Sequence, residues 1–255
     1  MIIDTHCHYD DEKFECDRKA LLCSMKEKGV ELVINSGADL DGCKDTIRMA
    51  KDYAFVYGTI GIHPNETGKM TEDTIDWLRT HSRQEKIVAI GEIGLDYYWD
   101  EPDHETQKFW FKRQLDLARE CKLPVVIHSR NAAEDTMAIM KAKNAGEIGG
   151  IIHCFSYSRE MAEEYVKMGF YIGVGGVVTF KNGRRMKETV QAVPLNRILL
   201  ETDCPYLSPE PYRGRRNDSS YLIYVAEQIA KLKNISVEKV IEITKQNAKI
   251  LYGVG

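Results

Sequence analysis

The stretch Ile87-Val88-Ala89-Ile90-Gly91 is a short apolar run that an acidic residue, Glu92, closes. A longer segment with helical spacing of its apolar residues, Glu105–Cys121, follows it along the chain. Short apolar runs of about four to eight residues are typical of buried strands, and apolar residues three and four positions apart are typical of helices. The stretch therefore predicts one strand followed by one helix, with a carboxylate at the carboxyl end of the strand.

The same unit recurs on both sides of this stretch. Eight apolar runs predict strands: Met1–Thr5, Leu32–Ser36, Phe55–Gly61, Ile87–Gly91, Leu123–His128, Gly150–His153, Phe170–Val174 and Ile198–Thr202. Helical patterns follow at Arg18–Lys28, Cys43–Lys51, Thr71–Thr80, Glu105–Cys121, Ala132–Lys143, Arg159–Lys167, Lys187–Ala192, Ser219–Leu232 and Val237–Leu251. Strands that alternate with helices indicate βα units and a parallel sheet. Eight such units in 255 residues predict an α/β fold of the (β/α)8 TIM-barrel type.

A doubly wound open sheet is the competing architecture. It usually carries a glycine-rich phosphate loop after an early strand, and neither GxGxxG nor GxxxxGK[ST] occurs in this chain. The glycine-rich Gly173-Val174-Gly175-Gly176 comes late, and we expect a tight turn there, at the end of the seventh strand. Because no low-complexity linker divides the sequence, we expect a single domain over residues 1–255.

Composition excludes several classes of protein. Hydrophobic residues make up 43% and charged residues 29% of the chain, which excludes a disordered chain, a collagen-like fibre and a small disulfide scaffold. The formal net charge of −4 means that any polyanion must be bound by a local basic patch. No apolar stretch approaches the roughly 18 residues of a membrane helix, and the N-terminus lacks the pattern of a signal peptide. Seven cysteines without CxxC pairs fit reduced thiols, so we expect a cytoplasmic protein without membrane association.

Potential metal ligands gather at the ends of the predicted strands. Four histidines and two carboxylates occupy these positions: His6, His8, Glu92, His128, His153 and Asp203. The carboxyl ends of the strands form the catalytic face of this barrel, so residues scattered over the sequence converge on one mouth. His6 and His8 are two positions apart and therefore point the same way from a strand. A lone histidine closing an apolar strand is commonly a core residue, but six such residues at strand ends predict a metal site.

Imidazole and carboxylate ligands suit several divalent ions, including Zn, Mn, Mg, Fe and Ni, and the absence of thiolate pairs argues against a structural zinc site. Six ligands exceed the needs of one tetrahedral ion. We therefore expect two divalent ions with Glu92 as the bridging ligand, a combination that can activate water and hold the attacking and leaving oxygens of a hydrolysis.

The sequence resembles the TatD family of metal-dependent deoxyribonucleases, within the wider amidohydrolase-type barrels. The segments that carry the resemblance span nearly the whole chain: Asp4-Thr5-His6-Cys7-His8, Gly61-Ile62-His63-Pro64, Gly91-Glu92-Ile93-Gly94-Leu95-Asp96-Tyr97, His128-Ser129-Arg130, His153-Cys154-Phe155-Ser156, Leu200-Glu201-Thr202-Asp203-Cys204-Pro205-Tyr206-Leu207 and Arg213-Gly214-Arg215-Arg216-Asn217. Three positions depart from the family pattern. Asn65 stands where a second histidine is common, Tyr157 where glycine is common, and Asp218-Ser219 where Glu-Pro is common. All three concern the substrate side more than the metal ligands.

The resemblance implies a hydrolase of phosphodiesters, of the exonuclease type, that acts on DNA at single strands or ends and requires divalent metal. It implies that the six strand-end residues are the ligands and that Asp203 also accepts the proton of the attacking water. His63, Arg130, Arg213, Arg215 and Asn217 become candidates to hold the scissile phosphate, a role that suits the planar fork of arginine. No obligate protein partner is implied.

A glutamate at the end of the fourth strand distinguishes this chain from many barrels of the wider group, which commonly bridge two ions with a carboxylated lysine. The nearest lysine, Lys86, lies at the other end of the predicted strand. Glu92 supplies a permanent carboxylate, which favours the nuclease branch over the lactonase and phosphotriesterase branches.

Two alternatives stay open. The same metal site can polarise a carbonyl group, so a carboxylic ester or amide hydrolase, such as an aminoacyl-tRNA deacylase, is the second enzyme class. A metal-binding module without catalysis is the third, although it would be expected to lose Glu92 or Asp203. Two further acids, Asp4 and Glu201, share strand parity with the ligands, and we expect at least one to accept a hydrogen bond from a ligating imidazole.

Overall fold

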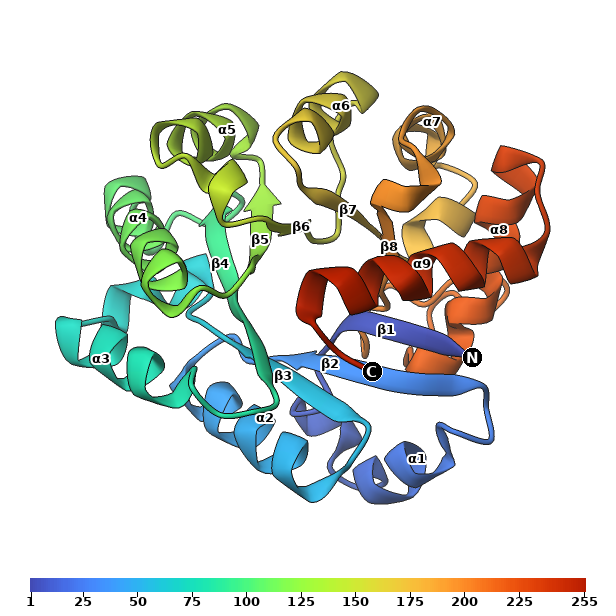
Figure 1. The fold of residues 1–255 in the computed structure, drawn as a ribbon, viewed down its shortest axis with the longest axis horizontal. Helices are drawn as coiled ribbons and strands as arrows, with labels where there is room; N and C mark the ends of the chain where they lie inside the picture. The colour runs from blue at the N-terminus through green and yellow to red at the C-terminus, as the bar shows by residue number, and fades with distance from the viewer. The chain divides into compact units, whose positions relative to one another are not determined.

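A computed structural model describes all 255 residues of the chain, and it contains one eight-stranded sheet with the order β1-β2-β3-β4-β5-β6-β7-β8 (Figure 1). The strands are β1 (Ile2–Cys7), β2 (Val30–Ser36), β3 (Val56–Ile60), β4 (Ile87–Asp96), β5 (Val125–Arg130), β6 (Gly150–Ile152), β7 (Tyr171–Val174) and β8 (Ile198–Leu200). Each strand neighbours the next one in sequence, and the pairs β1–β2, β3–β4, β4–β5, β5–β6 and β7–β8 are parallel. This is the topology of a (β/α)8 barrel, so the predicted fold class is confirmed.

Helices connect the strands at the predicted places. They are α1 (Arg18–Ser24), α2 (Leu40–Asp52), α3 (Glu72–His81), α4 (His104–Cys121), α5 (Ala133–Ala142), α6 (Arg159–Lys167), α7 (Arg184–Ala192), α8 (Leu222–Lys233) and α9 (Val237–Tyr252). Short 3-10 helices add η2 (Pro64–Lys69) and η4 (Gly176–Thr179). None of the helices combines the length and the apolar character needed to cross a membrane.

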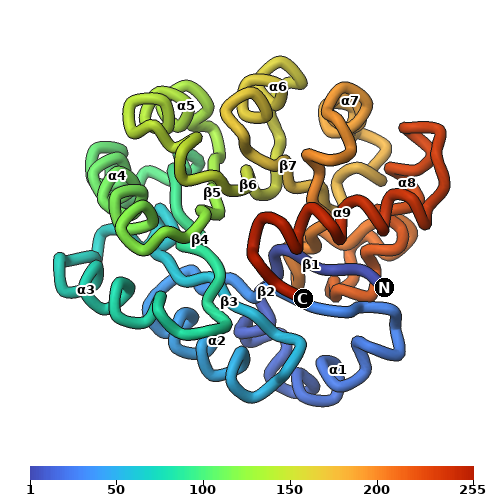
Figure 2. The backbone as a smooth tube through the Cα atoms, in the orientation of Figure 1, coloured from blue at the N-terminus to red at the C-terminus, as the bar shows by residue number.

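The chain divides into two compact units. The terminal unit contains Met1–Asn35, Cys154–Lys167 and Tyr171–Gly255, and the central unit contains Ser36–His153 and Met168–Phe170. In the terminal unit, α9 packs against α8 and also contacts β1 and β8 (Figure 2). In the central unit, α4 packs on β4 and on α3, and α2 packs on β3.

Two strands that carry site residues, β1 and β4, are buried along their whole length. All ten residues of β4 and all six of β1 are buried. Burial on both faces is typical of strands in a parallel sheet, which read as nearly continuous apolar runs. The polar residues Asp4, His6 and Glu92 interrupt these runs, and buried polar groups require partners.

The boundaries of two strands differ from the prediction in a way that matters for the site. β4 extends to Asp96 rather than ending at Gly91, because Ile93–Asp96 pair with β5 after a register shift that follows Ile90. β1 likewise has a register shift between Asp4 and Cys7, around His6. Such irregularities redirect side chains and are frequent next to active sites. Hydrophobic periodicity does not report them, because they depend on pairing with another strand.

A glycine allows the close approach of β4 to β5. Gly94 has a φ of +148°, and a Cβ there would lie 1.9 Å from the carbonyl oxygen of His128. Only glycine fits both the conformation and the space. This contact sets the side chains of Glu92 and Asp96 beside the end of β5.

Candidate metal centre

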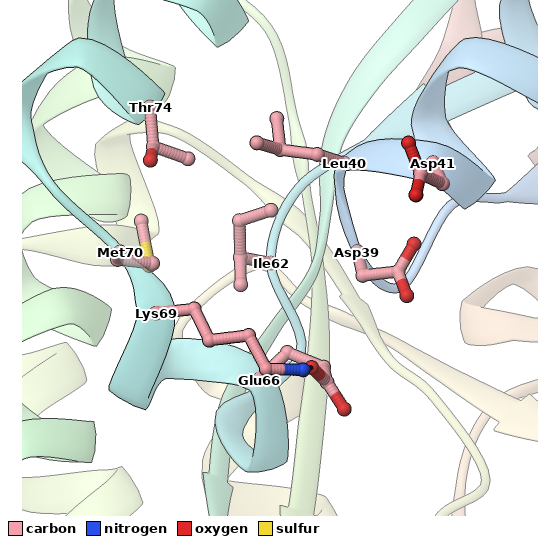
Figure 3. A pocket seen from close by; sticks show the side chains of 8 residues that line it. All are labelled: Asp39, Leu40, Asp41, Ile62, Glu66, Lys69, Met70 and Thr74. Atoms are coloured by element: carbon pink, nitrogen blue, oxygen red, sulfur yellow. Dashed lines mark hydrogen bonds and ion pairs between the residues drawn. The ribbon is translucent and has the colours of Figure 1, made fainter.

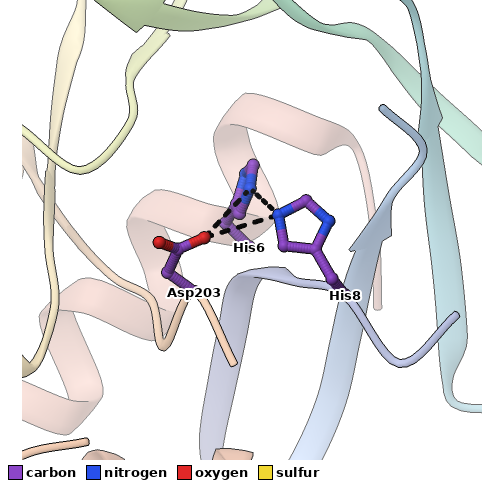
Figure 4. Close-up of side chains that lie close together, drawn as sticks. All are labelled: His6, His8 and Asp203. Carbon is purple, nitrogen blue, oxygen red and sulfur yellow. Dashed lines mark hydrogen bonds and ion pairs between the residues drawn. The ribbon is translucent and has the colours of Figure 1, made fainter. Parts of the chain in front are cut away.

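The six predicted ligands and His63 form two clusters, one in each unit. In the terminal unit, the Nε2 atoms of His6 and His8 lie 3.0 Å apart. Asp203 places Oδ1 3.4 Å from Nε2 of His8 and 3.9 Å from Nε2 of His6 (Figure 4). We call these three residues the terminal cluster. The predicted common direction of the two histidines is confirmed by their contact.

Backbone hydrogen bonds position the terminal cluster. The N–H of Asp203 donates to the carbonyl of His6 over 3.0 Å, and the N–H of His8 donates to the carbonyl of Cys204 over 2.8 Å. The segment after β8 therefore runs alongside β1. This places Asp203 next to His6 and His8, although these residues are far apart in the sequence.

Asp4 connects the two segments that carry the terminal cluster. Its carboxylate accepts hydrogen bonds from the N–H groups of His6 and Thr202 and from the hydroxyls of Thr202 and Ser219. Burial raises the pKa of Asp4 to about 7, against the lowering effect of these hydrogen bonds. The carboxylate of Asp4 is thus occupied by backbone and hydroxyl donors rather than by an imidazole ring. Glu201 accepts a hydrogen bond from the N–H of Cys154 over 2.6 Å.

The central unit carries the second cluster, around Glu92. Oε1 of Glu92 lies 2.7 Å from Nδ1 of His128, 3.7 Å from Nε2 of His153 and 3.9 Å from Nε2 of His63. The rings of His63 and His128 meet edge to face, with 4.3 Å between their centres. We call these four residues the central cluster. Glu92 is 3% exposed, so its polar partners are the facing imidazoles rather than solvent.

His63 thus lies beside two predicted ligands, Glu92 and His128, and not only at a position from which it could contact phosphate. It precedes η2, and its Nδ1 accepts a hydrogen bond from the N–H of Asn65 over 3.2 Å. This bond leaves Nε2 to face Glu92. His63, Glu92 and His128 each offer a ligand atom, and these atoms lie within 4.8 Å of one another.

Asp96 is a site residue to which the sequence alone assigned no role, although it lies within a family-like motif. Its Oδ2 lies 3.1 Å from Nε2 of His128, and its Oδ1 accepts a hydrogen bond from the N–H of Tyr98. Burial lowers the pKa of His128, but the contacts with Asp96 and Glu92 outweigh it and raise that pKa. Burial likewise raises the pKa of Asp96, but the contacts with His128 and Tyr98 outweigh it and lower that pKa. Asp96 is four positions after Glu92 on the same strand, and residues an even number of positions apart on a strand point to the same face. This spacing could have predicted that the two carboxylates lie on one side.

Two buried glutamines of α4 hold the backbone beside the central cluster. Gln114 accepts from the N–H of Ile62 over 2.8 Å and donates to its carbonyl over 3.0 Å. Gln107 accepts from the N–H of Asp96 and donates to the carbonyls of Asp96 and Pro102. Each amide thereby replaces a missing backbone partner and fixes the chain next to His63 or at Asp96. The sequence alone does not predict that a glutamine on a helix is buried and bonds to the backbone of another segment.

Both clusters fit divalent cations. In the terminal cluster, three ligand atoms of the imidazole and carboxylate type lie within 4.8 Å of one another, and the two Nε2 atoms are 3.0 Å apart. In the central cluster, a buried carboxylate faces three imidazoles. These ligand types suit Zn, Mn, Fe and related ions. The residues that would hold metal are therefore those of the two clusters.

The candidate substrate residues have different environments. Arg130, at the end of β5, is exposed, and its guanidinium lies 3.8 Å from the ring centre of Tyr98. Arg213 and Arg215 are exposed and lie over the rings of Phe180 and Tyr212. These three arginines are accessible to a ligand.

Asn217 lies differently from the expectation. It is 1% exposed, and its side-chain amide donates to the carbonyls of Thr202 and Tyr206. Its donors are thus used to hold the segment that carries Asp203. We correct its predicted role from substrate contact to positioning of this segment.

A separate cavity of about 150 Å³ lies in the central unit (Figure 3). It is lined by Asp39, Leu40, Asp41, Ile62, Glu66, Lys69, Met70 and Thr74. Lys69 pairs with Glu66 over 2.7 Å. The lining contains no histidine, so this cavity is distinct from the candidate metal centre.

Comparisons with known proteins identify the family of the chain. The model of the family described as TatD related DNase matches residues 3–253. The chain is 44% identical to the metal-dependent hydrolase YabD of Bacillus subtilis (strain 168), over the full length of both. It is 33% identical to the metal-dependent hydrolase YcfH of Escherichia coli (strain K12), over 100% of this chain and 96% of that protein.

A solved structure shows the same fold. The crystal structure of YjjV, a TatD homologue from Escherichia coli K12, superimposes with a TM-score of 0.93 at 30% identity, over 100% of this chain and 98% of the other. The family match covers nearly every residue, and both clusters of metal-ligand side chains are in place. The chain therefore belongs to the TatD family, and it is a metal-dependent hydrolase.

Proposed function

We propose that the protein is a metal-dependent phosphodiesterase that hydrolyses DNA at single strands or ends. One observation carries this proposal: Arg130 follows His128 of the central cluster by two positions on β5, and it is exposed. A planar guanidinium next to metal ligands suits a substrate with two non-bridging phosphate oxygens. The family description, TatD related DNase, supports the same substrate.

Each cluster offers ligands for a divalent ion, so the protein would hold two ions, with Glu92 among the ligands of the central cluster. When bound, divalent ions supply Lewis acidity and lower the pKa of water. Asp203 accepts the proton of the attacking water. Arg130 and His63 orient the phosphate, and Asp96 holds the ring of His128 in place.

A metal-restoration experiment tests the proposal. The purified protein is stripped with EDTA, analysed for metal, and restored with Zn, Mn, Mg, Fe or Ni before digestion of end-labelled single-stranded and duplex oligonucleotides. We expect shortening of labelled strands that depends on metal and is absent with EDTA. Asp203→Asn should lower the rate about 10²–10⁴-fold, the range for loss of a general base.

The same preparation decides the alternative. Aminoacyl-tRNA and a simple carboxylic ester are assayed in parallel under each metal. Hydrolysis of these substrates without any cleavage of DNA would contradict the phosphodiesterase proposal and favour the deacylase. A near wild-type rate for Asp203→Asn at saturating metal would remove its role as the base.

We also place the protein in the cytoplasm as part of this proposal. No disulfide joins the seven cysteines, and Cys16 and Cys23 are exposed, which fits a reducing compartment. Fractionation of cells with an antibody to the protein tests this location.

A further inference from the structure

The loop between β4 and α4 presents two large aromatic side chains outward. Tyr98 is 52% exposed and Trp99 is 53% exposed, and their rings meet edge to face with 4.9 Å between centres. Neighbouring exposed aromatic residues on one loop are unfavourable for a protein in water unless they have a ligand. Trp99 comes seven positions after Glu92, so the loop begins at the strand that carries the central cluster.

The loop is held at both ends, so these rings have a defined position. At its start, the N–H of Tyr98 donates to Asp96, and the N–H of Tyr97 donates to the carbonyl of Arg130. At its end, Gln107 donates to the carbonyl of Pro102, and Asp103 caps the first turn of α4. A ring held in this way loses little conformational freedom when a ligand stacks on it.

Trp99 also lines a groove of about 490 Å³, together with Asn65, Asp100 and Glu101. This volume is within the range of small-ligand sites, roughly 300–1,000 Å³. Oδ1 of Asn65 is buried and has no hydrogen-bond partner within the protein, and the residue lines the groove. A buried carbonyl oxygen without a donor is costly, so a turn of this side chain toward an N–H group of a ligand in the groove would be favourable.

The groove adjoins the central cluster. The backbone N–H of Asn65 bonds to Nδ1 of His63, whose other ring nitrogen faces Glu92. Asn65 lines the groove and also contacts His63, so the groove begins next to a residue of the central cluster.

Charge decides which part of a nucleotide fits the groove. Asp100 and Glu101 are negative and repel a phosphate from it. Arg130, by contrast, lies against the face of Tyr98. Its positive charge is therefore beside Tyr98, the second exposed ring of this loop. The loop thus separates a surface that suits a flat uncharged group from one that suits a phosphate.

We propose that this groove is a nucleobase subsite, in which a base stacks on Trp99 and bonds through its polar edge to Asn65, while Arg130 holds a phosphate beside Tyr98. The inference rests on the proposed phosphodiesterase function and names how that function recognises its substrate. Stacking on an aromatic ring accepts every base, so the subsite selects unpaired nucleotides rather than a sequence.

Four variants of the full-length, metal-restored protein test the subsite: Trp99→Ala, Trp99→Phe, Asn65→Ala and the control Phe109→Ala. Phe109 lies on α4, outside the groove, and is also 53% exposed. Each variant is assayed on an ordinary single-stranded oligonucleotide and on an oligonucleotide of the same length whose residues all lack bases. Binding of both fluorescein-labelled strands is measured by anisotropy in EDTA, independently of catalysis.

We expect Trp99→Ala to raise KM for the ordinary strand about 5- to 150-fold, the range for loss of one base–aromatic stack. Its kcat should stay within about twofold, and its KM for the abasic strand should not change. Trp99→Phe should restore most of the affinity, because it keeps a ring in place. Asn65→Ala should weaken only the ordinary strand, and Phe109→Ala should change neither.

Two results overturn the subsite. One is an equal effect of Trp99→Ala on both strands, which would give the loop a structural role alone. The other is an effect of Phe109→Ala as large as that of Trp99→Ala. Failure of the proposed function has a different signature: no cleavage of any phosphodiester by the wild type with any metal, while the anisotropy comparison of the two strands still reports on the groove.

Discussion

Individual side chains in the two clusters owe their chemistry to partners distant in sequence. His128 contacts Glu92 through Nδ1 and Asp96 through Nε2, over 36 and 32 positions. The sequence predicted the ligand residues because imidazoles and carboxylates close the strands of a parallel sheet. It did not predict the role of Asp96, because the register shift of β4 places this residue inside the strand.

Asp96→Asn should lower metal affinity about 10- to 100-fold, the usual effect of removing a carboxylate that orients a ligating imidazole. The amide keeps the size of the side chain and can still accept from the N–H of Tyr98, so the fold should remain intact. Competition with a chelating dye measures the affinity. Asp100→Asn is the control, because Asp100 lies in the same loop and lines the groove instead of contacting His128.

Unchanged metal affinity in Asp96→Asn would show that Asp96 serves only the loop. A loss of affinity with an unchanged melting temperature would support its action through His128.

Among the elements, α4 does more than cover the sheet. Its buried Gln107 and Gln114 bond to the backbone at Asp96 and Ile62, next to the central cluster. Sequence periodicity predicted this helix correctly, since its apolar residues follow helical spacing. The function of the glutamines depends on β4 and on the segment before η2, which no local pattern contains.

Gln114→Leu should destabilise the protein by about 1–3 kcal/mol, because it leaves the N–H and carbonyl of Ile62 buried without partners. Urea unfolding measures the change. Lys112→Leu introduces the same side chain at an exposed position of the same helix and should have little effect. Equal stability of the two variants would contradict the assigned role of Gln114.

A partly buried ion pair joins β2 to α9. Glu31 contacts Lys245 and Lys249 and is 24% exposed. Burial raises the pKa of Glu31, but the two lysines outweigh it and lower that pKa below its ordinary value. A carboxylate with a lowered pKa in the folded state stabilises fully above its unfolded pKa, about 4.3, and loses this contribution as pH falls through the folded value.

Glu31→Gln should therefore lower the melting temperature at pH 7, and the difference from wild type should narrow as the pH falls below about 4.3, the unfolded pKa. Thermal unfolding followed by circular dichroism at a series of pH values tests this. Glu242→Gln, which removes an exposed partner of Lys239, is the control and should change little. A difference that stays constant as the pH falls below about 4.3 would mean that packing rather than charge explains the effect.

For the molecule as a whole, a net charge of −4 must be reconciled with the polyanionic substrate that we propose. Arg213 and Arg215 are exposed and supported by aromatic rings, so they offer a local basic surface. Arg216 is instead paired with Asp17 through two hydrogen bonds. Only part of the basic segment is therefore available to bind phosphate.

Replacing Arg213 and Arg215 together with Ala should raise KM for single-stranded DNA and leave metal content unchanged. The salt dependence of binding should become shallower by about 0.7 log units per log salt for each phosphate that the protein no longer neutralises. Titrations at several salt concentrations measure the slope. An unchanged slope and KM would assign both arginines to solvation of the surface, and phosphate recognition would rest on Arg130 and His63.

The chain's own pattern of residues was sufficient for the eight strands and the helices between them, and it named six candidate ligands at strand ends. Each of these features depends on local hydrophobic spacing or on the chemical type of one side chain. The grouping of the ligands, the place of His63 beside Glu92, the burial of Asn217 and the groove at Trp99 depend on contacts between distant segments. Gln114 and Ile62, for example, are 52 positions apart. Only folding brings such groups within hydrogen-bonding distance, because hydrogen bonds form between neighbours in space and not between neighbours in sequence.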